Sequence, residues 1–556
     1  MSKKVIGVAA GEAHTLALTD DGSVFSWGRG TFGRLGTGRE EDELSPVPIS
    51  FNGGRGGGGE QNEQPKFVGA AAGAYHSLAL QDDGSVWSWG YNIYSQLGHG
   101  EENASVPSLV ERFQELGAPE SLSEGPDQKH DIDDKKPLKV CSIKAGGMMS
   151  LAIDSLGALW VWGNTPQPGK TEDGEEFCLV TSSPPHPIRD FHGRTVVKVA
   201  CGNEHIVAAV TAGETFTGGN LVCYSWGNNG HGQLGLGDKE NRPRPVVVPA
   251  FSKDSPWTIY EIACGAAHSA VLTRGESVEQ EMGSKCWTFG LGDNGQLGHG
   301  TTGSTLLPEP VAGLPPDAIL ISLDCGLFHT SVVSTAGEVW SWGMERGLGL
   351  CPDACFAGND AGDALNPLRI TCTETTGGKF AGPVQVACGA AHTVLVAEDG
   401  RKLWAWGRGR SGVLGRGQEV DSYVPCAVTW PPLDADFKEE AERTGETKTS
   451  NQTVEGEEVQ ILREKLALME QYATMLHVSV FRKPFDQRNL SKWLPESGTF
   501  DIWRELEKMM DSAETDELAR LDTFYKSVRS TVKDKLMRRR VQEMVKESLV
   551  SLARGK

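Results

Sequence analysis

One pattern of residues recurs seven times along the chain and constrains its fold more than any other feature. A small residue and a glycine precede two variable residues and a histidine; an apolar stretch, a turn and an aromatic-x-Trp-Gly sequence follow. The first copy, from Ala9, reads AAGEAHTLALTDDGSVFSWGRGTFGRLGTG, and the seventh, from Cys388, reads CGAAHTVLVAEDGRKLWAWGRGRSGVLGRG. The marker glycines lie mostly 56 to 63 residues apart, with one gap of 73, at Gly11, Gly73, Gly146, Gly202, Gly265, Gly326 and Gly389. This period is typical of arrays of equivalent structural units.

Each copy has the alternation and the turns of a small antiparallel sheet. In the first copy, residues 14–18 and 24–27 have the pattern of strands, and the Asp-Asp-Gly turn at 20–22 joins them. Proline-containing segments at 45–48, 244–246 and 309–311 predict outer edge strands, where proline is tolerated. Since such a sheet cannot bury both faces alone, the copies must stack into a closed ring. The sequence therefore predicts an all-β, seven-bladed β-propeller over residues 1–432.

Aromatic residues occupy two fixed positions in every copy. A buried aromatic ring removes about 150–250 Å² from water, which is on the order of 4–6 kcal/mol before entropy costs. We therefore predict a packing belt between neighbouring blades and no ligand-stacking role for these side chains. The positions are Phe25, Trp27, Trp87, Trp89, Trp160, Trp162, Tyr224, Trp226, Trp287, Phe289, Trp340, Trp342, Trp404 and Trp406.

The repeated histidines and cysteines are predicted to be structural. Six histidines share one position, with Met149 in the third copy, at His14, His76, His205, His268, His329 and His392. Spread around a ring, they cannot converge on one metal, so we expect buried neutral imidazoles that are bonded to the backbone. Cysteines precede the marker glycine in four copies where the other copies have alanine, which indicates that they fill space. Cys351 and Cys355 have the spacing of half a zinc site, but no second pair matches it.

The sequence contains no catalytic motif that the repeats do not explain better. Residues 28–33 match G-x-G-x-x-G, but no amphipathic helix follows, so no dinucleotide cradle is expected. We predict no catalytic residue, no cofactor and no metal, and therefore a protein that is not an enzyme.

Composition restricts the partners and the compartment. The formal net charge of −21 argues against direct nucleic-acid binding. No run of about 18 apolar residues predicts a membrane span, and no signal peptide is recognisable at the start. Twelve cysteines fit a reducing compartment. We expect the protein in the nucleus, the cytoplasm or both.

The repeat consensus resembles the regulator of chromosome condensation repeat. The matching elements are G-x-x-H-T, D-G-x-V-x-x-W-G and G-Q-L-G-x-G, and the resemblance covers residues 5–430. With its tail, the chain looks like a plant-type member with a C-terminal helical extension. The resemblance implies a seven-bladed propeller that serves as a binding platform.

Two activities of the family receive different support from the sequence. The founding member is a chromatin-bound nucleotide exchange factor for the GTPase Ran, but only a short basic stretch, residues 2–4, precedes the first repeat here. A plant relative senses UV-B through tryptophans in G-W-R-H repeats. None of the seven copies has tryptophan at that position, which holds Glu12, Ala74, Gly147, Asn203, Ala266, Leu327 and Ala390. A UV-B role is therefore not expected.

Departures from the repeat are candidate sites, because loops carry specific function. The third copy lacks the histidine and has residues 164–169 in place of Gly-Gln-Leu-Gly, and residues 53–59 form a glycine-rich loop. The acidic cluster at 130–134 is compatible with weak cation binding or with a solvated loop. If copies one and seven are neighbours in the ring, six arginines of their loops form a patch for an acidic partner; the alternative is that they are scattered and solvated. They are Arg29, Arg34, Arg39, Arg408, Arg410 and Arg416.

The chain changes character after residue 432. Residues 433–458 are acidic and poor in apolar side chains, which predicts a flexible linker. Residues 459–556 are predicted to be helical and partly coiled coil. A heptad pattern over 459–480 indicates an oligomerisation seam for a homodimer, a site for a partner helix or a helix folded on the propeller. The predicted seam residues are Leu462, Leu466, Met469, Ala473, Leu476 and Val480.

A basic run near the end of the chain has two interpretations. It resembles a nuclear-import patch, but the basic face of a solvated helix looks the same. Its residues are Lys533, Lys535, Arg538, Arg539 and Arg540.

Taken together, these features predict a non-enzymatic protein–protein interaction scaffold with a regulatory role in the nucleus or cytosol. The alternative is a guanine-nucleotide exchange factor for a small Ran-like GTPase, with chromatin association. Small GTPases and nuclear or chromatin proteins are the partners that these two functions imply.

Overall fold

The computed structural model describes residues 3–51, 65–115, 138–171, 174–191, 193–212, 221–275, 283–344, 363–371 and 379–430. These residues form seven four-stranded sheets, the blades of the propeller. Blade 1 contains β1 (Val5–Ala10), β2 (His14–Thr19), β3 (Val24–Gly28) and β4 (Glu43–Pro48); blade 2 contains β5 (Phe67–Ala72), β6 (His76–Gln81), β7 (Val86–Gly90) and β8 (Ala104–Leu109); blade 3 contains β9 (Val140–Ala145), β10 (Met149–Asp154), β11 (Leu159–Thr171) and β12 (Gly174–Pro187).

The remaining blades repeat this order. Blade 4 contains β13 (Val196–Cys201), β14 (His205–Thr211), β15 (Leu221–Gly227) and β16 (Arg242–Val247); blade 5 contains β17 (Trp257–Cys264), β18 (His268–Gly275), β19 (Lys285–Gly290) and β20 (Thr305–Pro310); blade 6 contains β21 (Leu320–Cys325), β22 (His329–Ser334), β23 (Val339–Gly343) and β24 (Ala364–Ile370); blade 7 contains β25 (Gln385–Cys388), β26 (His392–Ala397), β27 (Lys402–Gly407) and β28 (Ser422–Ala427). The helical segments described are short: α1 (Arg112–Glu115), η1 (Thr31–Gly33), η2 (Arg189–Phe191), η3 (Pro249–Phe251), η6 (Glu398–Gly400) and η7 (Arg410–Gly412).

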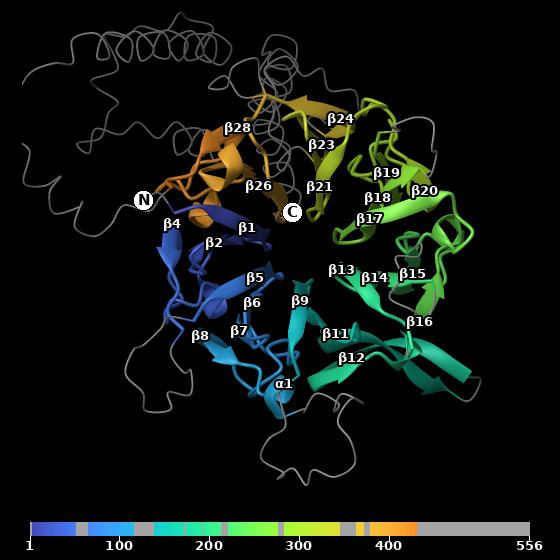
Figure 1. Cartoon of the computed structure of the whole chain (residues 1–556), viewed down its shortest axis with the longest axis horizontal. Coiled ribbons are helices and arrows are strands. Elements are labelled where there is room, and N and C mark those ends of the chain that lie inside the picture. Colours follow the sequence, from blue (N-terminus) through green and yellow to red (C-terminus); the bar gives the residue numbers. More distant parts are fainter. Residues whose placement is uncertain are drawn as a thin grey trace, which may run out of the picture. The chain divides into compact units, whose positions relative to one another are not determined.

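Every blade is an antiparallel meander whose strands pair in chain order. The first strand of each blade lies at the central opening and the fourth at the rim (Figure 1). The proline-containing segments form the outermost strands β4, β16 and β20, as predicted. The predicted seven-bladed β-propeller is confirmed.

The meander gives the ring two faces that differ in their loops. Loops between the first and second strands and between the third and fourth strands of each blade emerge on one face, which we call the upper face. Where the structure describes them, the turns between the second and third strands and the connections between blades emerge on the other face. The marker Gly-x-x-His loops and the Gly-Gln-Leu-Gly loops therefore share the upper face.

Blade 3 departs from this plan. At residues 164–169, which replace the Gly-Gln-Leu-Gly sequence of other copies, β11 continues through Thr171 and pairs with β12 down to Gly174. The result is a two-stranded ribbon that projects beyond the other blades (Figure 1). The ribbon is bound to blade 4, because Arg244 Nε and Nη2 donate to the Glu175 carboxylate at 2.7 and 2.8 Å.

The buried core is divided among the interfaces between blades, which we call seams. Seven apolar clusters occur, and each contains residues from two neighbouring blades. The aromatic residue before each Trp-Gly glycine belongs to the seam with the preceding blade; Trp89, for example, packs with Leu16 and Leu18 of blade 1. Of the fourteen aromatic positions, twelve are buried, and Tyr224 and Trp287 are half-buried. The predicted belt is thus observed.

The chain divides into two compact units, Met1–Asp434 and Ala435–Lys556. The second unit lies outside the described residues, and so do the predicted linker, the oligomerisation seam and the basic run. The same holds for the acidic cluster at 130–134, the glycine-rich loop at 53–59 and the pair Cys351 and Cys355. In the part of the chain that the structure describes, no helix is long and apolar enough to cross a membrane.

Candidate functional site

The marker glycines form a closed ring around the axis of the propeller. A methyl group added to Gly11 would lie 2.4 Å from the carbonyl oxygen of Gly73, and the same approach is repeated from blade to blade. The ring closes at Gly389, where the added carbon would lie 2.5 Å from the Gly11 oxygen. None of these glycines has positive φ, so the requirement for glycine at this position is one of space.

In the six copies that have it, the histidine stands directly over its own marker glycine. The carbon added to Gly11 would be 2.4 Å from His14 Cε1. Each imidazole Nε2 lies within hydrogen-bond distance of a serine or threonine hydroxyl in the next blade: His14 with Ser77 at 2.9 Å, His76 with Ser150 at 2.8 Å, His205 with Ser269 at 3.0 Å, His268 with Thr330 at 3.0 Å, His329 with Thr393 at 2.9 Å and His392 with Thr15 at 3.2 Å. The sequence-based expectation of backbone partners was therefore wrong. The histidines join neighbouring blades through side-chain hydroxyls.

A second hydrogen bond fixes the direction of this contact. The Ser77 hydroxyl donates to the Arg34 carbonyl at 2.8 Å, and the Thr330 hydroxyl donates to the Gln296 carbonyl at 2.9 Å. Since a hydroxyl has one proton to give, the imidazole Nε2 must donate to it. The histidine therefore carries its proton on Nε2, and its blade is connected to the next by a relay of imidazole, hydroxyl and carbonyl.

Burial keeps these imidazoles neutral. Desolvation lowers the pKa of His76, His268 and His392 to about 3 and that of His205 and His329 to about 4. The pKa of His14 is also well below its ordinary value, through burial and then through the nearby Arg34. An added proton on Nδ1 would have no acceptor, because this atom lacks a partner in most copies. The prediction of neutral, buried imidazoles agrees with this arrangement.

The hydroxyl residues of the relay were missed at the level of sequence. They occupy the position directly after the histidine, or after Met149 in the third copy, and they are Thr15, Ser77, Ser150, Ser269, Thr330 and Thr393. The recurring Ser or Thr after the histidine was a visible signal, but its partner belongs to a different copy. Periodicity within one copy cannot reveal that pairing.

The seam between blades 3 and 4 lacks the relay on both sides. Blade 3 has Met149 in place of the histidine, and blade 4 has Ile206 in place of the hydroxyl residue. Both side chains are fully buried in the apolar cluster of this seam. The exception in the histidine series is thus matched by an exception in the hydroxyl series, and the pair remains complementary.

The cysteines before the marker glycine behave as the sequence predicts. Cys201, Cys325 and Cys388 are buried, and Cys264 is half-buried. Burial raises the pKa of the Cys201 thiol to about 12 and that of the other three well above the ordinary value. Thiols held in the protonated state are poor nucleophiles and poor metal ligands, so these residues fill space.

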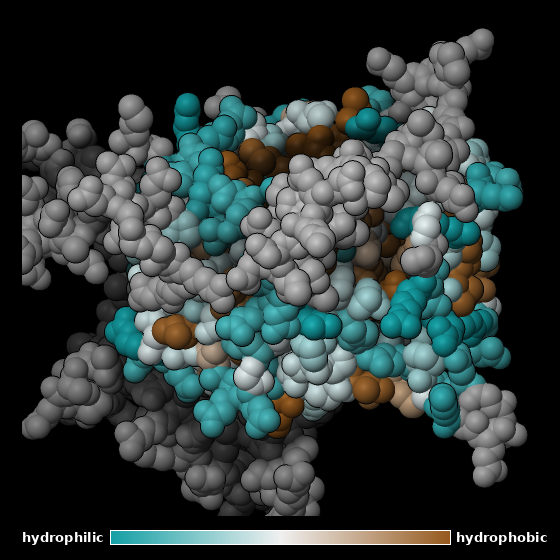
Figure 2. All heavy atoms as spheres, turned by 60° about the horizontal axis from the view of Figure 1, so that its bottom comes forward, coloured by the Kyte–Doolittle hydropathy of each residue, from teal (hydrophilic) through white to brown (hydrophobic). Residues whose placement is uncertain are grey.

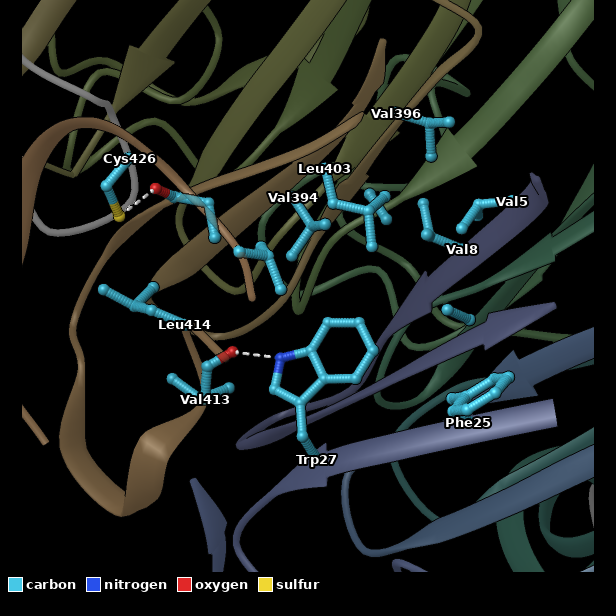
Figure 3. Close-up of a cluster of buried hydrophobic side chains, with 14 residues drawn as sticks. Val5, Val8, Phe25, Trp27, Val394, Val396, Leu403, Val413, Leu414 and Cys426 are labelled. Carbon is cyan, nitrogen blue, oxygen red and sulfur yellow. Dashed lines mark hydrogen bonds between the residues drawn. The ribbon is translucent and has the colours of Figure 1, made fainter. Parts of the chain in front are cut away.

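The ring is closed by side-chain contacts between blades 7 and 1, since each blade is built from its own contiguous segment. Trp27 Nε1 donates to the Val413 carbonyl at 2.9 Å within a shared apolar cluster (Figure 3). The Gln385 amide both accepts from Val8 N and donates to Val8 O, each at 3.0 Å. After the last strand, Trp430 Nε1 donates to the Lys3 carbonyl at 3.1 Å, which ties the two ends of the propeller together.

The six arginines of the predicted patch differ in their exposure. The loops of blades 1 and 7 share the upper face and are neighbours, because Gly417 N donates to the Leu44 carbonyl at 2.8 Å. Arg29, Arg39, Arg410 and Arg416 are exposed, and Arg408 is half-buried. Arg39 forms an ion pair with Glu43 at 3.0 Å.

Arg34 does not belong to an exposed patch, which corrects the prediction for this residue. It is 1% exposed, and its guanidinium donates to the carbonyls of Thr31 and Ala74 at 2.9 and 3.1 Å. It occupies the position of glutamine in the Gly-Gln-Leu-Gly loops. Here the residue braces blade 1 against blade 2.

Among the described residues, no group of three or more histidine, cysteine or acidic side chains is arranged to hold a metal ion. The stretch 28–33 folds into the three-residue turn η1 and begins no longer helix. In the view of Figure 2 the surface is mostly hydrophilic, with hydrophobic side chains in small separate patches.

Comparisons with known proteins agree with this architecture. Residues 1–271 match the model of the RCC1-like domain, and residues 284–333, 384–413 and 400–435 match models of the regulator of chromosome condensation (RCC1) repeat. The chain belongs to the RCC1 repeat family.

Relatives in the RCC1 repeat family include proteins of different kinds. Ultraviolet-B receptor UVR8 of Arabidopsis thaliana is 28% identical over 77% of this chain and 82% of its own length. The E3 ubiquitin-protein ligase HERC2 of Mus musculus is 28% identical over 70% of this chain, which spans 7% of that protein. The structure of yeast Prp20, an RCC1 protein, is similar with a TM-score of 0.55 and 22% identity, and covers 79% of this chain and 96% of its own. The Arabidopsis relative agrees with the plant-type resemblance.

Proposed function

We propose that this RCC1-repeat propeller is a non-enzymatic protein-interaction scaffold whose upper face receives an acidic partner. The supporting observation is the closed seam between blades 7 and 1, which brings two arginine-bearing loops together on that face. The exposed arginines of these loops are Arg29, Arg39, Arg410 and Arg416. The six repeat histidines and the four cysteines before the marker glycines are engaged in packing between blades, which supports a structural role for them.

The loops are held rigidly, which favours a preformed binding surface. Asp42 accepts a hydrogen bond from Gly30 N at 2.8 Å, and Asp421 accepts one from Gly409 N at 2.8 Å. In each loop, one aspartate therefore stabilises the backbone of its own loop. Arg29, Arg410 and Arg416 are exposed in these loops, beside the exposed acidic residues Glu40, Glu41 and Glu419.

The test compares the wild-type chain with a variant that carries Glu at positions 29, 39, 410 and 416. Quantitative affinity purification from the source cells should show loss of a defined set of partners with the variant. A variant with Lys at the same positions is the matched control and should retain them. Equal recovery of every partner by the Glu variant would contradict the proposal.

The second candidate function is guanine-nucleotide exchange on a small GTPase, with chromatin association. It is supported by the fold shared with Prp20, a protein whose structure was described with its binding to Gsp1p and histones. A fluorescence assay of nucleotide release across a panel of small GTPases distinguishes the two functions. Acceleration by the purified chain would replace the scaffold with an exchange factor.

We place the protein in the nucleus or cytoplasm and assign residues 459–480 to homodimerisation as further parts of the proposal. The basic run at 533–540 and the heptad pattern support these assignments at the level of sequence. Light scattering of the full chain and of a chain ending at Pro432 tests the dimer; equal monomer masses would contradict it. Imaging of a tagged chain with the basic run neutralised tests nuclear import.

A further inference from the structure

An aromatic cluster covers the seam between blades 1 and 2 on the upper face. Phe32 of the blade 1 loop lies 4.6 Å from the ring centre of Tyr91 and 5.9 Å from that of Tyr75. Tyr75 and Tyr91 are 5.9 Å apart in an edge-to-face arrangement. All three rings are half-buried, so each keeps part of its surface available to a partner.

The cluster rests on a rigid support. The buried Arg34 guanidinium lies 4.6 Å from the ring centre of Tyr75 and 5.8 Å from that of Phe32. Its hydrogen bonds to backbone carbonyls of both blades fix its position. The rings are therefore held before any partner arrives, which lowers the entropy cost of binding.

Phe32 adopts a backbone conformation that an aromatic residue rarely takes. Its φ is +66° and its ψ is 13°, a left-handed conformation whose cost for a non-glycine residue is of order 1–3 kcal/mol. Blade 7 has a serine, Ser411, in the same conformation at the equivalent position. The turn itself thus needs no aromatic side chain, and Phe32 is present for another reason.

The neighbouring loop of blade 2 extends the apolar surface. Ile93 and Tyr94 follow Tyr91, and they are 64% and 38% exposed. At these two positions blades 4 and 5 have polar or small residues, Gly230-His231 and Asp293-Asn294. Since the same turn forms without apolar residues, burial within the fold does not explain Ile93 and Tyr94.

Arg29 gives the surface a charge. It is exposed and close enough to influence the protonation of both Arg34 and Tyr75. Tryptophan, tyrosine and arginine are the side chains that contribute most to binding at protein interfaces. The acidic Glu12 is also nearby: burial raises the pKa of Tyr75, and the Glu12 carboxylate raises it further.

We propose that Arg29, Phe32, Tyr75, Tyr91, Ile93 and Tyr94 form a docking surface for a linear peptide segment that carries an apolar side chain next to a carboxylate. The apolar side chain packs on the ring cluster and on Ile93, and the carboxylate pairs with Arg29. This inference rests on the proposed function, because it assigns the contact surface through which the scaffold recognises an acidic partner.

The experiment selects a phage-displayed library of random twelve-residue peptides on the immobilised full chain. Enriched peptides are synthesised, and their affinities are measured by fluorescence anisotropy. The expected sequences combine an apolar or aromatic residue with Asp or Glu a few positions away. The first test variant is Ile93→Thr/Tyr94→Ser, which introduces the residues that blades 1 and 7 have at these positions.

The double variant should bind the selected peptide about tenfold more weakly, with an unchanged melting temperature. Arg29→Gln should weaken binding about threefold and reduce its dependence on salt. The matched control Leu307→Ser removes an exposed apolar side chain from the rim in β20 and should have no effect. Peptide binding that is unchanged in the double variant, or selected peptides without acidic residues, would overturn the proposal.

Failure of the proposed function gives a different result. If the variant with Glu at 29, 39, 410 and 416 retains all cellular partners, the arginine-bearing face is not the scaffold's contact. Peptide binding that still depends on Ile93 and Tyr94 would then stand as a property of blades 1 and 2.

Discussion

The seam between blades 3 and 4 and the seam between blades 5 and 6 solve one packing problem in two ways. At the 5/6 seam, His268 donates to Thr330, which donates to the Gln296 carbonyl. At the 3/4 seam, Met149 and Ile206 fill the same space without a hydrogen bond. Blade 3 instead extends a ribbon whose Glu175 pairs with Arg244 of blade 4.

The comparison shows what the relay contributes. A polar pair in a buried seam is directional and requires both partners, whereas an apolar pair requires matching shape. The 3/4 seam shows that the fold tolerates either solution when both sides change together. The six buried histidine–hydroxyl contacts also make the propeller sensitive to protons in a way that the 3/4 seam is not.

The largest expected effect is loss of stability in acid. The histidine pKa values are about 3 to 4 in the folded state and about 6.5 in the unfolded chain. Unfolding therefore takes up protons below pH 6.5. The free energy of unfolding decreases as the pH is lowered, until the folded histidines also become protonated. The slope is about 1.4 kcal/mol per pH unit for each histidine and about 8 for six together.

Urea unfolding followed by tryptophan fluorescence between pH 4 and 7 measures this slope. The variant His268→Met/Thr330→Ile gives the 5/6 seam the residue types of the 3/4 seam. It should reduce the slope by the contribution of one histidine, about 1.4 kcal/mol per pH unit. A free energy of unfolding that does not change between pH 6.5 and 4 would contradict the relay.

A methyl group on a marker glycine should be more harmful at a seam with the relay. In Gly265→Ala the new carbon would lie 2.1 Å from His268 Cε1 and 2.5 Å from the Gly326 oxygen. In Gly146→Ala it meets the Gly202 oxygen at 2.4 Å and Cys201 Sγ at 2.9 Å, with no imidazole ring present. We expect losses at the upper end of about 1–3 kcal/mol for Gly265→Ala and at the lower end for Gly146→Ala.

Chemical unfolding of the two alanine variants tests this difference. Adding His268→Ala to Gly265→Ala removes the ring and should recover part of the loss. Equal destabilisation by Gly265→Ala and Gly146→Ala would show that the carbonyl contact alone sets the requirement for glycine.

Breaking one side of the relay should cost more than replacing both sides. Thr330→Ile leaves the His268 Nε2–H and the Gln296 carbonyl without a buried partner, at about 1–3 kcal/mol. A double-mutant cycle with His268→Met should show a favourable coupling of about 0.5–3 kcal/mol. Simple additivity of the two losses would mean that the imidazole and the hydroxyl act independently.

The smallest expected effect concerns the ion pairs of the ribbon. Arg244, Glu175 and Asp190 are partly exposed, so solvent and salt weaken their attraction. Arg244→Ala should leave the melting temperature unchanged and increase hydrogen exchange in the paired strands 164–181. Added salt should have the same effect on the wild-type chain. A cooperative loss of global stability would show instead that the ribbon holds the 3/4 seam closed.

Much of the fold follows from short-range patterns. The alternation in 14–18, the Asp-Asp-Gly turn and the aromatic pair at 25 and 27 each lie within one blade, and the structure shows the strands and the belt that they predict. The projecting ribbon was not predicted, because residues 164–187 include prolines and lack the repeat pattern. Beside the ribbon, Arg244 of blade 4 pairs with Glu175, a contact between residues far apart in the sequence.

Residues of the candidate site were harder to predict because their environment comes from other copies. Arginine is a residue type usually found at the surface, yet Arg34 is buried against the carbonyl of Ala74 and the ring of Tyr75 in blade 2. Isoleucine and tyrosine are residue types usually found in the core, yet Ile93 and Tyr94 are exposed. In both cases the neighbour that decides burial lies outside the local sequence.

The sequence by itself determined the number of blades, the strands of each blade, the aromatic belt and the need for glycine at the marker position. The strands and turns depend on residues within one repeat, and all seven copies carry the same pattern. The same periodicity marks the aromatic and glycine positions, although their packing partners lie in the neighbouring blade. Only the tertiary structure decided the partner of each histidine, the matched exception at Met149 and Ile206 and the closure of the ring by Gln385. These contacts join residues that are 57 to 377 positions apart, and such pairs become neighbours only when all the blades have packed.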